Sequence, residues 1–186
     1  MRKIVNSTYI SLDGDIEKLD QWSFDYWSDD LERFATKQLF AADTLLMGRE
    51  TYENFASAWS GRAGADEFAD RMNAIDKVVI SDTLTGGDWG PTTVVSRAGV
   101  AAAITALKGQ PGGDILMYGF GPVAKTLLAH DLLDEVRFWV HPVIAGSSSS
   151  LAADGFMHRL KLVRTDAMDT GVVVLSYTPG GAPAAS

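Results

Sequence analysis

The chain has 186 residues, with 24 acidic and 16 basic side chains, a formal net charge of −8 and no cysteine. One domain of this length buries about 70% of its surface and needs no disulfide for stability. No basic cluster favours a nucleic-acid partner, and no stretch approaches the roughly 20 apolar residues that span a membrane. The basic start is not followed by the apolar core of a signal peptide, so we expect a cytoplasmic protein.

The first part of the chain predicts a strand, a helix and a second strand. Residues 3–12 alternate well enough for a strand, which ends at Asp13-Gly14-Asp15 because glycine accepts a positive φ. Ser28 or Asp29 then caps a helix that runs toward residue 42. Residues 44–47 form a short apolar run, which is typical of a strand covered on both faces.

This alternation continues to residue 144, and the end of the chain differs. Helices are expected over residues 50–58, 65–74, 100–108 and 123–129, and strands over 77–80, 92–95, 115–118 and 135–144. Residues 160–165 and 172–177 predict an antiparallel hairpin. The pattern therefore indicates an α/β protein with a mostly parallel sheet and an antiparallel C-terminal hairpin, in a single domain over 1–178. The serine-rich loop over 146–150 and the tail over 179–186 are expected to be flexible.

The end of the strand over 44–47 carries residues that suit phosphate binding. Gly48 and Arg49 follow the strand, and Thr51 lies where the next helix should be capped. Backbone N–H groups at a helix start, with an arginine beside them, hold a phosphate through the helix dipole and charge-assisted hydrogen bonds. The alternative is an ordinary cap beside a solvent-exposed arginine.

A glycine-rich turn after residue 118 is a second candidate phosphate site. Gly119, Gly121 and Pro122 belong to a segment that fits G-x-G-x-x-A between a strand and a helix. The glycines would let a pyrophosphate approach the backbone, and a proline at the first helical position costs no hydrogen bond. Because no acidic residue after a following parallel strand completes a dinucleotide fingerprint, a plain tight turn stays open as the alternative.

Two other strand ends carry polar side chains. Ser81 would contact a ribose phosphate or cap the following turn. Asp13 and Asp15 lie in a glycine turn, where acids are usually solvated. The sequence shows no zinc-binding spacing, no G-x-S-x-G elbow and no P-loop, so we expect no metal and exclude α/β-hydrolase and P-loop kinase chemistry.

Together these segments resemble one protein family. The segments occur in the same order and at the same spacing as in that family. The most specific of them are Gly48-Arg49-Glu50-Thr51-Tyr52-Glu53 and Leu133-Asp134-Glu135-Val136. Over residues 2–177 the chain is similar to the dihydrofolate reductase-like group that contains the reductase domain of the bifunctional riboflavin-biosynthesis enzyme. The resemblance implies a three-layer α/β/α sandwich in a standalone bacterial member that binds NADPH.

The resemblance also implies roles for individual residues. It assigns the cofactor's phosphates to Gly48, Arg49 and Thr51, its adenosine 2′-phosphate to Ser81, and its pyrophosphate to the turn with Gly119, Gly121 and Pro122. Reduction of a C=N or C=O bond also needs a proton donor within hydrogen-bond reach.

Two aspartates are candidates for that donor. Asp30, with Asp29 beside it, resembles the catalytic acid of dihydrofolate reductase, although an acid favoured by the helix dipole is an equal alternative. Asp13 is the second candidate, because its loop resembles the one that covers the nicotinamide. Ser7 and Thr8 are expected on the substrate side.

The departures from the family limit the choice of substrate. Gly146 is followed by four serines instead of a glycine-rich turn, Pro122 replaces a glycine, and no deaminase domain is present. Beyond Arg49 no basic cluster would hold a phosphorylated substrate. The expected function is therefore an NADPH-dependent reductase of a small heterocyclic or carbonyl substrate. The alternatives are 5-amino-6-(5-phosphoribosylamino)uracil reductase, dihydrofolate reductase, and a non-catalytic nucleotide-binding protein.

A homodimer is also expected. The strand over 136–140 places aromatic side chains on both faces, and relatives of the riboflavin-reductase type are dimers. The partners predicted for this chain are thus a small-molecule substrate and a second copy.

Overall fold

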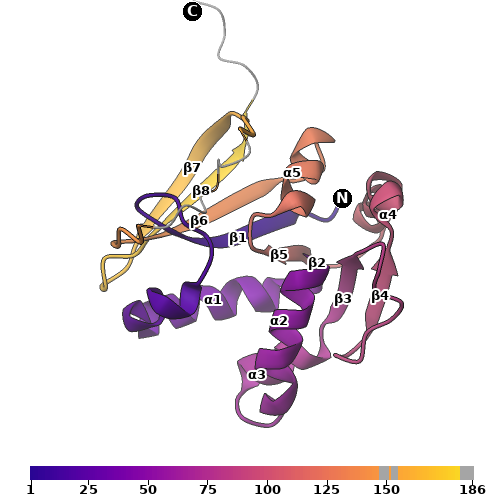
Figure 1. Ribbon diagram of the computed structural model, residues 1–186, viewed down its shortest axis with the longest axis horizontal. Coiled ribbons are helices and arrows are strands. Elements are labelled where there is room, and N and C mark those ends of the chain that lie inside the picture. The colour runs from indigo at the N-terminus through magenta and orange to yellow at the C-terminus, as the bar shows by residue number, and fades with distance from the viewer. Residues whose placement is uncertain (147–150, 152–154, 181–186) are drawn as a thin grey trace, which may run out of the picture.

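The computed structural model describes residues 1–146, 151 and 155–180, and it confirms the α/β fold with a mostly parallel sheet. Within that part of the chain, eight strands form one sheet in the order β4-β3-β2-β5-β1-β6-β8-β7 (Figure 1). The strands are β1 (Ile4–Ser11), β2 (Ala42–Gly48), β3 (Asp76–Ile80), β4 (Thr92–Val95), β5 (Asp114–Tyr118), β6 (Glu135–His141), β7 (Leu160–Ala167) and β8 (Val173–Pro179). The strands from β4 to β6 in this order are parallel, and β8 and β7 form the predicted antiparallel hairpin.

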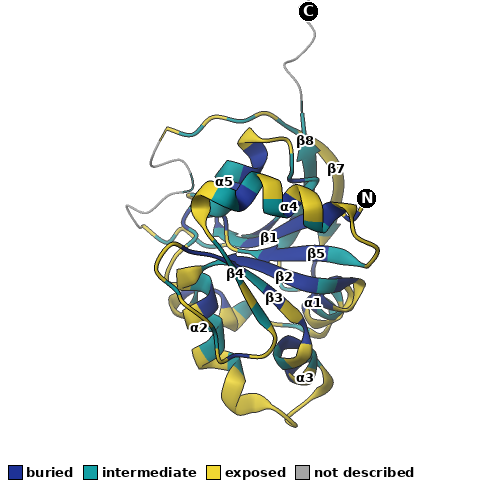
Figure 2. Cartoon of the chain, turned by 90° about the vertical axis from the view of Figure 1, so that its right-hand side faces the viewer, coloured by how far each residue is buried: buried dark blue, intermediate teal, exposed yellow. Residues whose placement is uncertain are grey.

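Helices cover both faces of the sheet, as a three-layer sandwich requires (Figure 2). They are α1 (Asp29–Ala41), α2 (Arg49–Trp59), α3 (Glu67–Ala74), α4 (Val100–Gly109) and α5 (Pro122–Ala129). Side chains of α1, α2 and α3 share one buried apolar cluster with the sheet or pack against it, whereas α4 and α5 belong to a cluster on the opposite face. None of the helices in the described residues combines the length and the apolar character needed to cross a membrane.

The apolar run in β2 shows why this strand lies inside the sheet. Leu45, Leu46 and Met47 are at most 1% exposed although successive side chains point to opposite faces. Leu46 packs in the cluster with α4 and α5, and Leu45 and Met47 pack in the cluster with α1, α2 and α3. A continuous apolar sequence is therefore required here, as the sequence predicted.

Two predicted boundaries are wrong by a few residues. The strand expected to reach residue 144 ends at His141, because Pro142 has no N–H for the ladder and the chain turns there. At the other end, β8 includes Pro179, and the Gly180 N–H donates to the carbonyl of Arg159 at 2.8 Å. The segments 147–150 and 181–186, expected to be flexible, lie outside the described residues.

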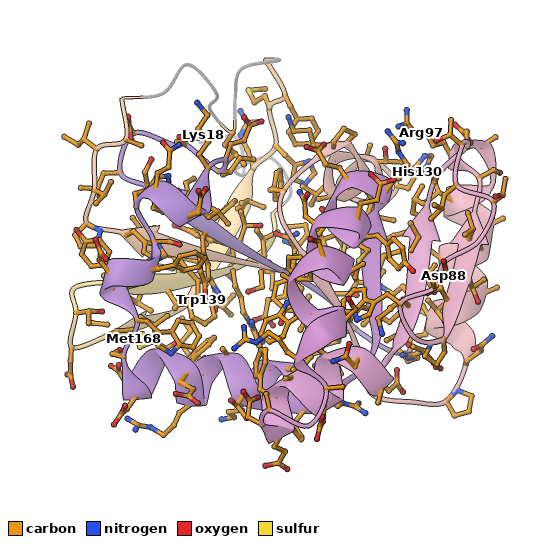
Figure 3. The ribbon with its side chains drawn as sticks, turned by 60° about the horizontal axis from the view of Figure 1, so that its bottom comes forward. Lys18, Asp88, Arg97, His130, Trp139 and Met168 are labelled. Carbon is orange, nitrogen blue, oxygen red and sulfur yellow. The ribbon has the colours of Figure 1, made fainter. Side chains whose placement is uncertain are left out.

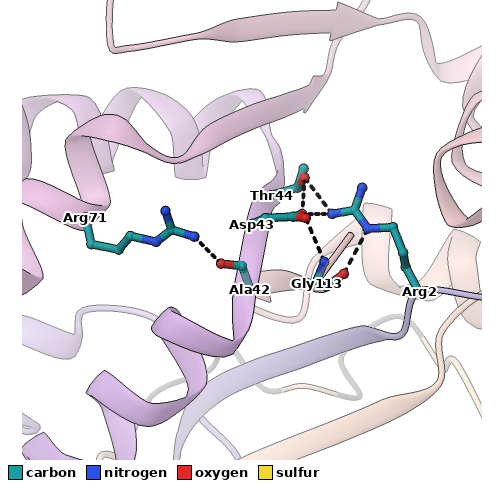
Figure 4. A network of polar contacts seen from close by, with 6 residues as sticks. All are labelled: Arg2, Ala42, Asp43, Thr44, Arg71 and Gly113. Carbon is teal, nitrogen blue, oxygen red and sulfur yellow. Dashed lines mark hydrogen bonds and ion pairs between the residues drawn. The ribbon is translucent and has the colours of Figure 1, made fainter. Parts of the chain in front are cut away.

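An ion pair between a buried arginine and a partly exposed aspartate joins the amino ends of the strands (Figure 4). Arg2 is 7% exposed, pairs with Asp43, and donates from Nε to the Gly113 carbonyl at 2.9 Å. Asp43 in turn accepts from the Gly113 N–H at 2.7 Å. These contacts join β1, β2 and β5 at one edge of the sheet and leave loops and helix starts at the opposite, carboxyl edge.

Candidate functional site

The position of β5 marks a topological switch point at the carboxyl edge. β5 lies between β2 and β1. The chain leaves β5 for α5 on one face, whereas it leaves β1 and β2 for α1 and α2 on the other face. Open parallel sheets bind ligands where neighbouring connections diverge in this way. The strand ends around β5 are therefore the place to look for a site.

The two predicted phosphate-binding turns meet at this point. A Cβ atom added to Gly48 would lie 3.5 Å from Val123 Cγ2, and one added to Gly119 would lie 3.9 Å from Thr51 Oγ1. The starts of α2 and α5 are thus in contact. Gly119 has a φ of +76°, a conformation that glycine adopts readily and other residues rarely do. A Cβ at Gly121 would meet no atom within 4 Å, so the backbone of the turn is open to a ligand.

The starts of α2 and α5 have no side-chain cap. Gly48 and Gly121 occupy the two cap positions, and neither offers a side chain to the first backbone N–H groups. The starts of α1 and α4 also lack a side-chain cap, whereas α3 is capped by Asp66, whose carboxylate accepts from the Ala69 N–H at 2.7 Å. Two adjoining uncapped helix starts, with their positive dipole ends, suit a bound diphosphate.

The predicted capping role of Thr51 is wrong. The helix begins at Arg49, so Thr51 is its third residue, and its hydroxyl lies next to Gly119. Pro122 occupies the first position of α5, as expected, where the missing N–H costs no hydrogen bond.

Arg49 projects from the start of α2 toward solvent. Its Nη1 lies 3.6 Å from Glu53 Oε1, and both side chains are about half exposed. Such a surface pair contributes little to stability. A phosphate at the helix start can therefore replace Glu53 as the partner of the guanidinium at little cost.

Ser81 lies beside this helix start, because Ile80 pairs with Gly48. Its hydroxyl accepts from the N–H groups of Thr83 at 3.1 Å and Leu84 at 2.9 Å. The structure therefore shows the turn-capping alternative. Its oxygen also lies 3.4 Å from Thr83 Oγ1, so a phosphate would compete with Thr83 for the hydrogen of the Ser81 hydroxyl.

Arg97 is a basic residue of this edge that the sequence did not single out. Ile80 pairs with Val95 at the ends of β3 and β4, which brings Arg97 close to Ser81. Its Nε lies 3.7 Å from Asp82 Oδ2, and its side chain is 76% exposed (Figure 3). Only the pairing of β3 with β4 reveals the arginine as a candidate, since no motif surrounds it.

Asp13 connects two loops at the same edge. Its carboxylate accepts from Ser11 Oγ at 2.6 Å, and from the N–H groups of Ala145 at 2.9 Å and Gly146 at 2.8 Å. These hydrogen bonds, the one from Ser11 first, lower the pKa of Asp13 to about 2. The side chain is thus ionised at neutral pH and has no proton to donate.

Asp30 has a similar arrangement at the start of α1. Its carboxylate accepts from the Ser28 hydroxyl, and from the N–H groups of Leu31 and Asp169, each at 2.9 Å. The hydrogen bond from Ser28 is the main cause that lowers the pKa of Asp30. This geometry favours the alternative reading of Asp30 as an acid that stabilises a helix start and ties it to the β7–β8 turn.

Ser7 and Thr8 do not face one side of the site together. As successive residues of β1 they point to opposite faces of the sheet. Ser7 Oγ accepts from Gln38 Nε2 at 3.0 Å and from Trp139 Nε1 at 2.8 Å, beneath α1 (Figure 3). On the other face, Thr8 Oγ1 donates to Asn6 Oδ1 at 2.9 Å.

Asn6 is a buried polar residue that the sequence reasoning missed. Its side chain is fully buried, and Nδ2 donates to the Gly119 carbonyl at 2.7 Å. The asparagine therefore holds the turn in which Gly119 adopts its positive φ. Its position in the first strand gave no hint of this contact, which spans 113 residues of sequence.

Tyrosine and histidine side chains lie near the same strand ends, on the face covered by α1 and α2. Burial raises the pKa of Tyr9 and of Tyr118, so both phenols are neutral at physiological pH. His141 is enclosed by Tyr9, Trp22 and Tyr26, and burial lowers its pKa. In the described ranges, no three His, Asp or Glu side chains are grouped in a way that could hold a metal ion.

Solved structures share this fold at low sequence identity. A protein assigned to riboflavin biosynthesis from Shewanella sp. PV-4 has a TM-score of 0.72 and 17% identity, with 96% of this chain and 99% of that chain covered. A pyrimidine reductase-like protein from Corynebacterium diphtheriae has a TM-score of 0.64 and 15% identity, with 97% and 93% covered.

A third structure contains a further domain. The diaminohydroxyphosphoribosylaminopyrimidine deaminase/5-amino-6-(5-phosphoribosylamino)uracil reductase of Thermotoga maritima has a TM-score of 0.64 and 14% identity. The match covers 96% of this chain but 57% of that protein. At these identities the likeness shows the fold alone.

Sequence relationships are more specific. The uncharacterized protein YyaP of Bacillus subtilis (strain 168) is 28% identical over 182 residues, which cover 95% of this chain and 94% of that protein. Residues 2–174 match the family described as the RibD C-terminal domain. Because this match extends over nearly the whole described fold, from β1 into β8, the chain belongs to the RibD C-terminal domain family.

Proposed function

We propose that this protein is an NADPH-dependent reductase that transfers a hydride to a small pteridine-like, pyrimidine-like or carbonyl substrate. The observation that carries the proposal is the meeting of two uncapped helix starts, those of α2 and α5, around the open turn at Gly119. Membership of the RibD C-terminal domain family supports an oxidoreductase. When bound, the reduced nicotinamide supplies the hydride.

The residues at the carboxyl edge fit the phosphates of such a cofactor. Gly48, Arg49 and Thr51 would hold phosphate oxygens at the start of α2, and the turn with Gly119, Gly121 and Pro122 would face the pyrophosphate. Ser81 and Arg97 would contact the 2′-phosphate that distinguishes NADPH from NADH. A cytoplasmic location stays a prediction.

The proposal is tested first by cofactor binding. We expect NADPH to bind more tightly than NADH in a fluorescence titration. The change Arg49→Ala should weaken NADPH binding about tenfold, because one charge-assisted hydrogen bond contributes roughly 1.5 kcal/mol. Arg33→Ala, which removes an exposed arginine of α1, serves as the control and should leave the affinity unchanged.

Turnover is tested next. NADPH oxidation would be followed with dihydrofolate, 5-amino-6-(5-phosphoribosylamino)uracil and a series of small carbonyl compounds. Oxidation with one of these compounds identifies the substrate class. If neither nucleotide binds, the cofactor assignment is wrong. If NADPH binds and no compound is reduced, the protein is a nucleotide-binding module.

We also infer that the protein forms a homodimer, but not through the surface that the sequence suggested. Phe138 and Trp139 of β6 are 8% and 0% exposed within one chain, so neither is available to a partner. Exposed apolar side chains occur instead on the edge strand β7, where Leu162 and Val163 are 51% and 60% exposed. This strand is the candidate contact between two copies.

A further inference from the structure

We propose that the hydroxyl group of Tyr118 donates the proton that accompanies hydride transfer. The inference rests on the proposed reductase function and assigns one of its chemical roles. Neither aspartate favoured by the sequence suits that role, because Asp13 and Asp30 are ionised acceptors that hold loops together. Tyr118 is a neutral donor at the same edge of the sheet.

Tyr118 lies next to the residues proposed to bind the cofactor. It is the last residue of β5 and immediately precedes Gly119. Its ring centroid lies 5.2 Å from that of Phe55 on α2. Thr51 and Phe55 are one helical turn apart on the same side of α2, and Thr51 faces Gly119. The phenol is thus one turn of α2 away from the proposed phosphate site.

The Tyr118 hydroxyl lies beside a polar network on the face covered by α1. Tyr118 pairs with Ser7 in the parallel register, so both side chains lie on the face covered by α1. There, Gln38 donates from Nε2 to Ser7 Oγ at 3.0 Å, and its Oε1 accepts from Arg137 Nη1 at 3.3 Å. Gln38 also lies near the Tyr118 hydroxyl, and this interaction lowers the pKa of Tyr118.

The environment keeps the phenol protonated. Burial is the main cause that raises the pKa of Tyr118, and the nearby Tyr9 raises it further, while the hydrogen bond with Gln38 lowers it. The donor is consequently in its active form at every pH at which the enzyme would work. A carboxylic acid with a lowered pKa would be in its active form only in strongly acidic solution.

The proton balance of the step is simple. The hydride adds to the carbon atom of the C=N or C=O bond, and the π electron pair moves to the nitrogen or oxygen. That atom takes the proton of the Tyr118 hydroxyl, whose O–H bond breaks to leave a phenolate. The phenolate then recovers a proton from water. Burial makes this phenol a weaker acid than a free one, but an alkoxide or amide anion is more basic still, so the proton moves to the substrate atom.

Tyr9 provides a matched control. It is also a tyrosine of raised pKa on the same face. However, its ring packs against Trp139 at 5.2 Å and His141 at 4.9 Å, toward β6 and away from α2. Removal of its hydroxyl should leave the chemical step in place.

The test compares Tyr118→Phe, Tyr9→Phe and wild type on the compound that wild type reduces. We expect Tyr118→Phe to lower kcat about 100-fold or more, the usual contribution of a general acid. NADPH affinity, measured by fluorescence without turnover, should change less than about threefold, since the ring and its contact with Phe55 are retained. Tyr9→Phe should keep kcat within about threefold of wild type. Wild-type kcat should stay flat from about pH 6 to 9, because the donor remains protonated.

Other outcomes would overturn the proposal. An unchanged kcat in Tyr118→Phe shows that the proton comes from another group. A wild-type kcat that falls as the pH rises from about 4 to 6 identifies a carboxyl group as the donor. Loss of NADPH binding in Tyr118→Phe assigns the hydroxyl to cofactor binding instead. If wild type itself binds NADPH without turnover, the proposed function fails and this inference fails with it.

Discussion

Asp13 and Asp30 show how a residue type that suits catalysis can serve structure instead. Each carboxylate accepts one hydrogen bond from a serine hydroxyl and further bonds from backbone N–H groups. Asp13 thereby connects the loop after β1 to the segment after β6, and Asp30 connects the start of α1 to the β7–β8 turn. The serine partners, Ser11 and Ser28, lie only two residues away in the sequence, yet the sequence analysis did not single out either pairing. It could not reveal partners more than 130 residues distant.

The role of Asp30 as a structural acceptor leads to a pH-dependent prediction. Asp30→Ala should lower the urea midpoint of unfolding at pH 7, because the N–H groups of Leu31 and Asp169 lose their acceptor. The pKa of Asp30 in the folded chain is lowered from 3.8, so its contribution is present above that pH and is lost as the pH falls through the folded value. The difference from wild type should therefore shrink as the pH falls below 3.8.

Asp29→Ala is the control for this experiment. Asp29 is an exposed neighbour in the same first turn and accepts none of the hydrogen bonds described for Asp30. If both variants unfold at the same urea concentration as wild type, the contacts of Asp30 do not contribute to stability.

At the scale of secondary-structure elements, Lys77 holds the end of a helix. Its amino group is buried and donates to the carbonyls of Asn73 at 3.0 Å and Ile75 at 2.7 Å, at the C-terminus of α3. It also lies 4.3 Å from the ring centroid of Trp89. Burial lowers the pKa of Lys77 to about 8, more than nearby Asp76 raises it. The positive charge at the helix end is favourable, but it lies in a poorly hydrated place.

The lowered pKa of Lys77 leads us to expect that the free energy of unfolding rises at alkaline pH. Between a folded pKa of about 8 and an unfolded one near 10.5, the unfolded chain binds more protons, so the free energy of unfolding increases with pH. We expect a rise of about 1.5 kcal/mol between pH 8 and 9.5 in urea titrations. Higher pH is avoided because the raised pKa values of Tyr9 and Tyr118 act in the opposite direction.

Lys77→Met should remove this slope, whatever its effect on stability at pH 7. Lys37→Met, which changes an exposed lysine of α1, should keep the slope. An equal rise in all three proteins would show that another group titrates.

The sequence predicted nearly all the helices and strands, because the residues that start, end or bury each one lie within it or next to it in the sequence. The apolar run of β2, the glycine at the β7–β8 turn and the proline at the start of α5 each act within a few residues. What the sequence could not predict is which strands are neighbours. Arg97 and Asn6 become candidates only when β4 lies beside β3 and β1 lies beside β5, and Gln38 only when α1 covers that pair of strands.

At the scale of the whole molecule, the exposed edge strand β7 suggests how two copies form the proposed homodimer. Within the described residues β7 pairs with β8 alone, and its Leu162 and Val163 are exposed. We expect sedimentation at micromolar concentration to show a dimer, and the double change Leu162→Lys and Val163→Lys to shift it to the monomer. Adding like charges to both copies opposes contact without disturbing buried residues. A wild-type species with the mass of one chain would contradict the homodimer.

Because β5 lies in the middle of the sheet, β1 and β2 cannot complete their pairing until late in synthesis. In the part of the chain that the structure describes, β1 pairs with β5 and β6 alone, and their residues leave the ribosome more than a hundred positions later. Until then, the first strand has no neighbour, and β2 has an apolar edge where β5 will insert. Such long-range pairing slows folding and leaves aggregation-prone apolar segments exposed on the nascent chain. The first strand synthesised is therefore among the last to be protected, and a chaperone that shields apolar strands would act before residue 118 has emerged.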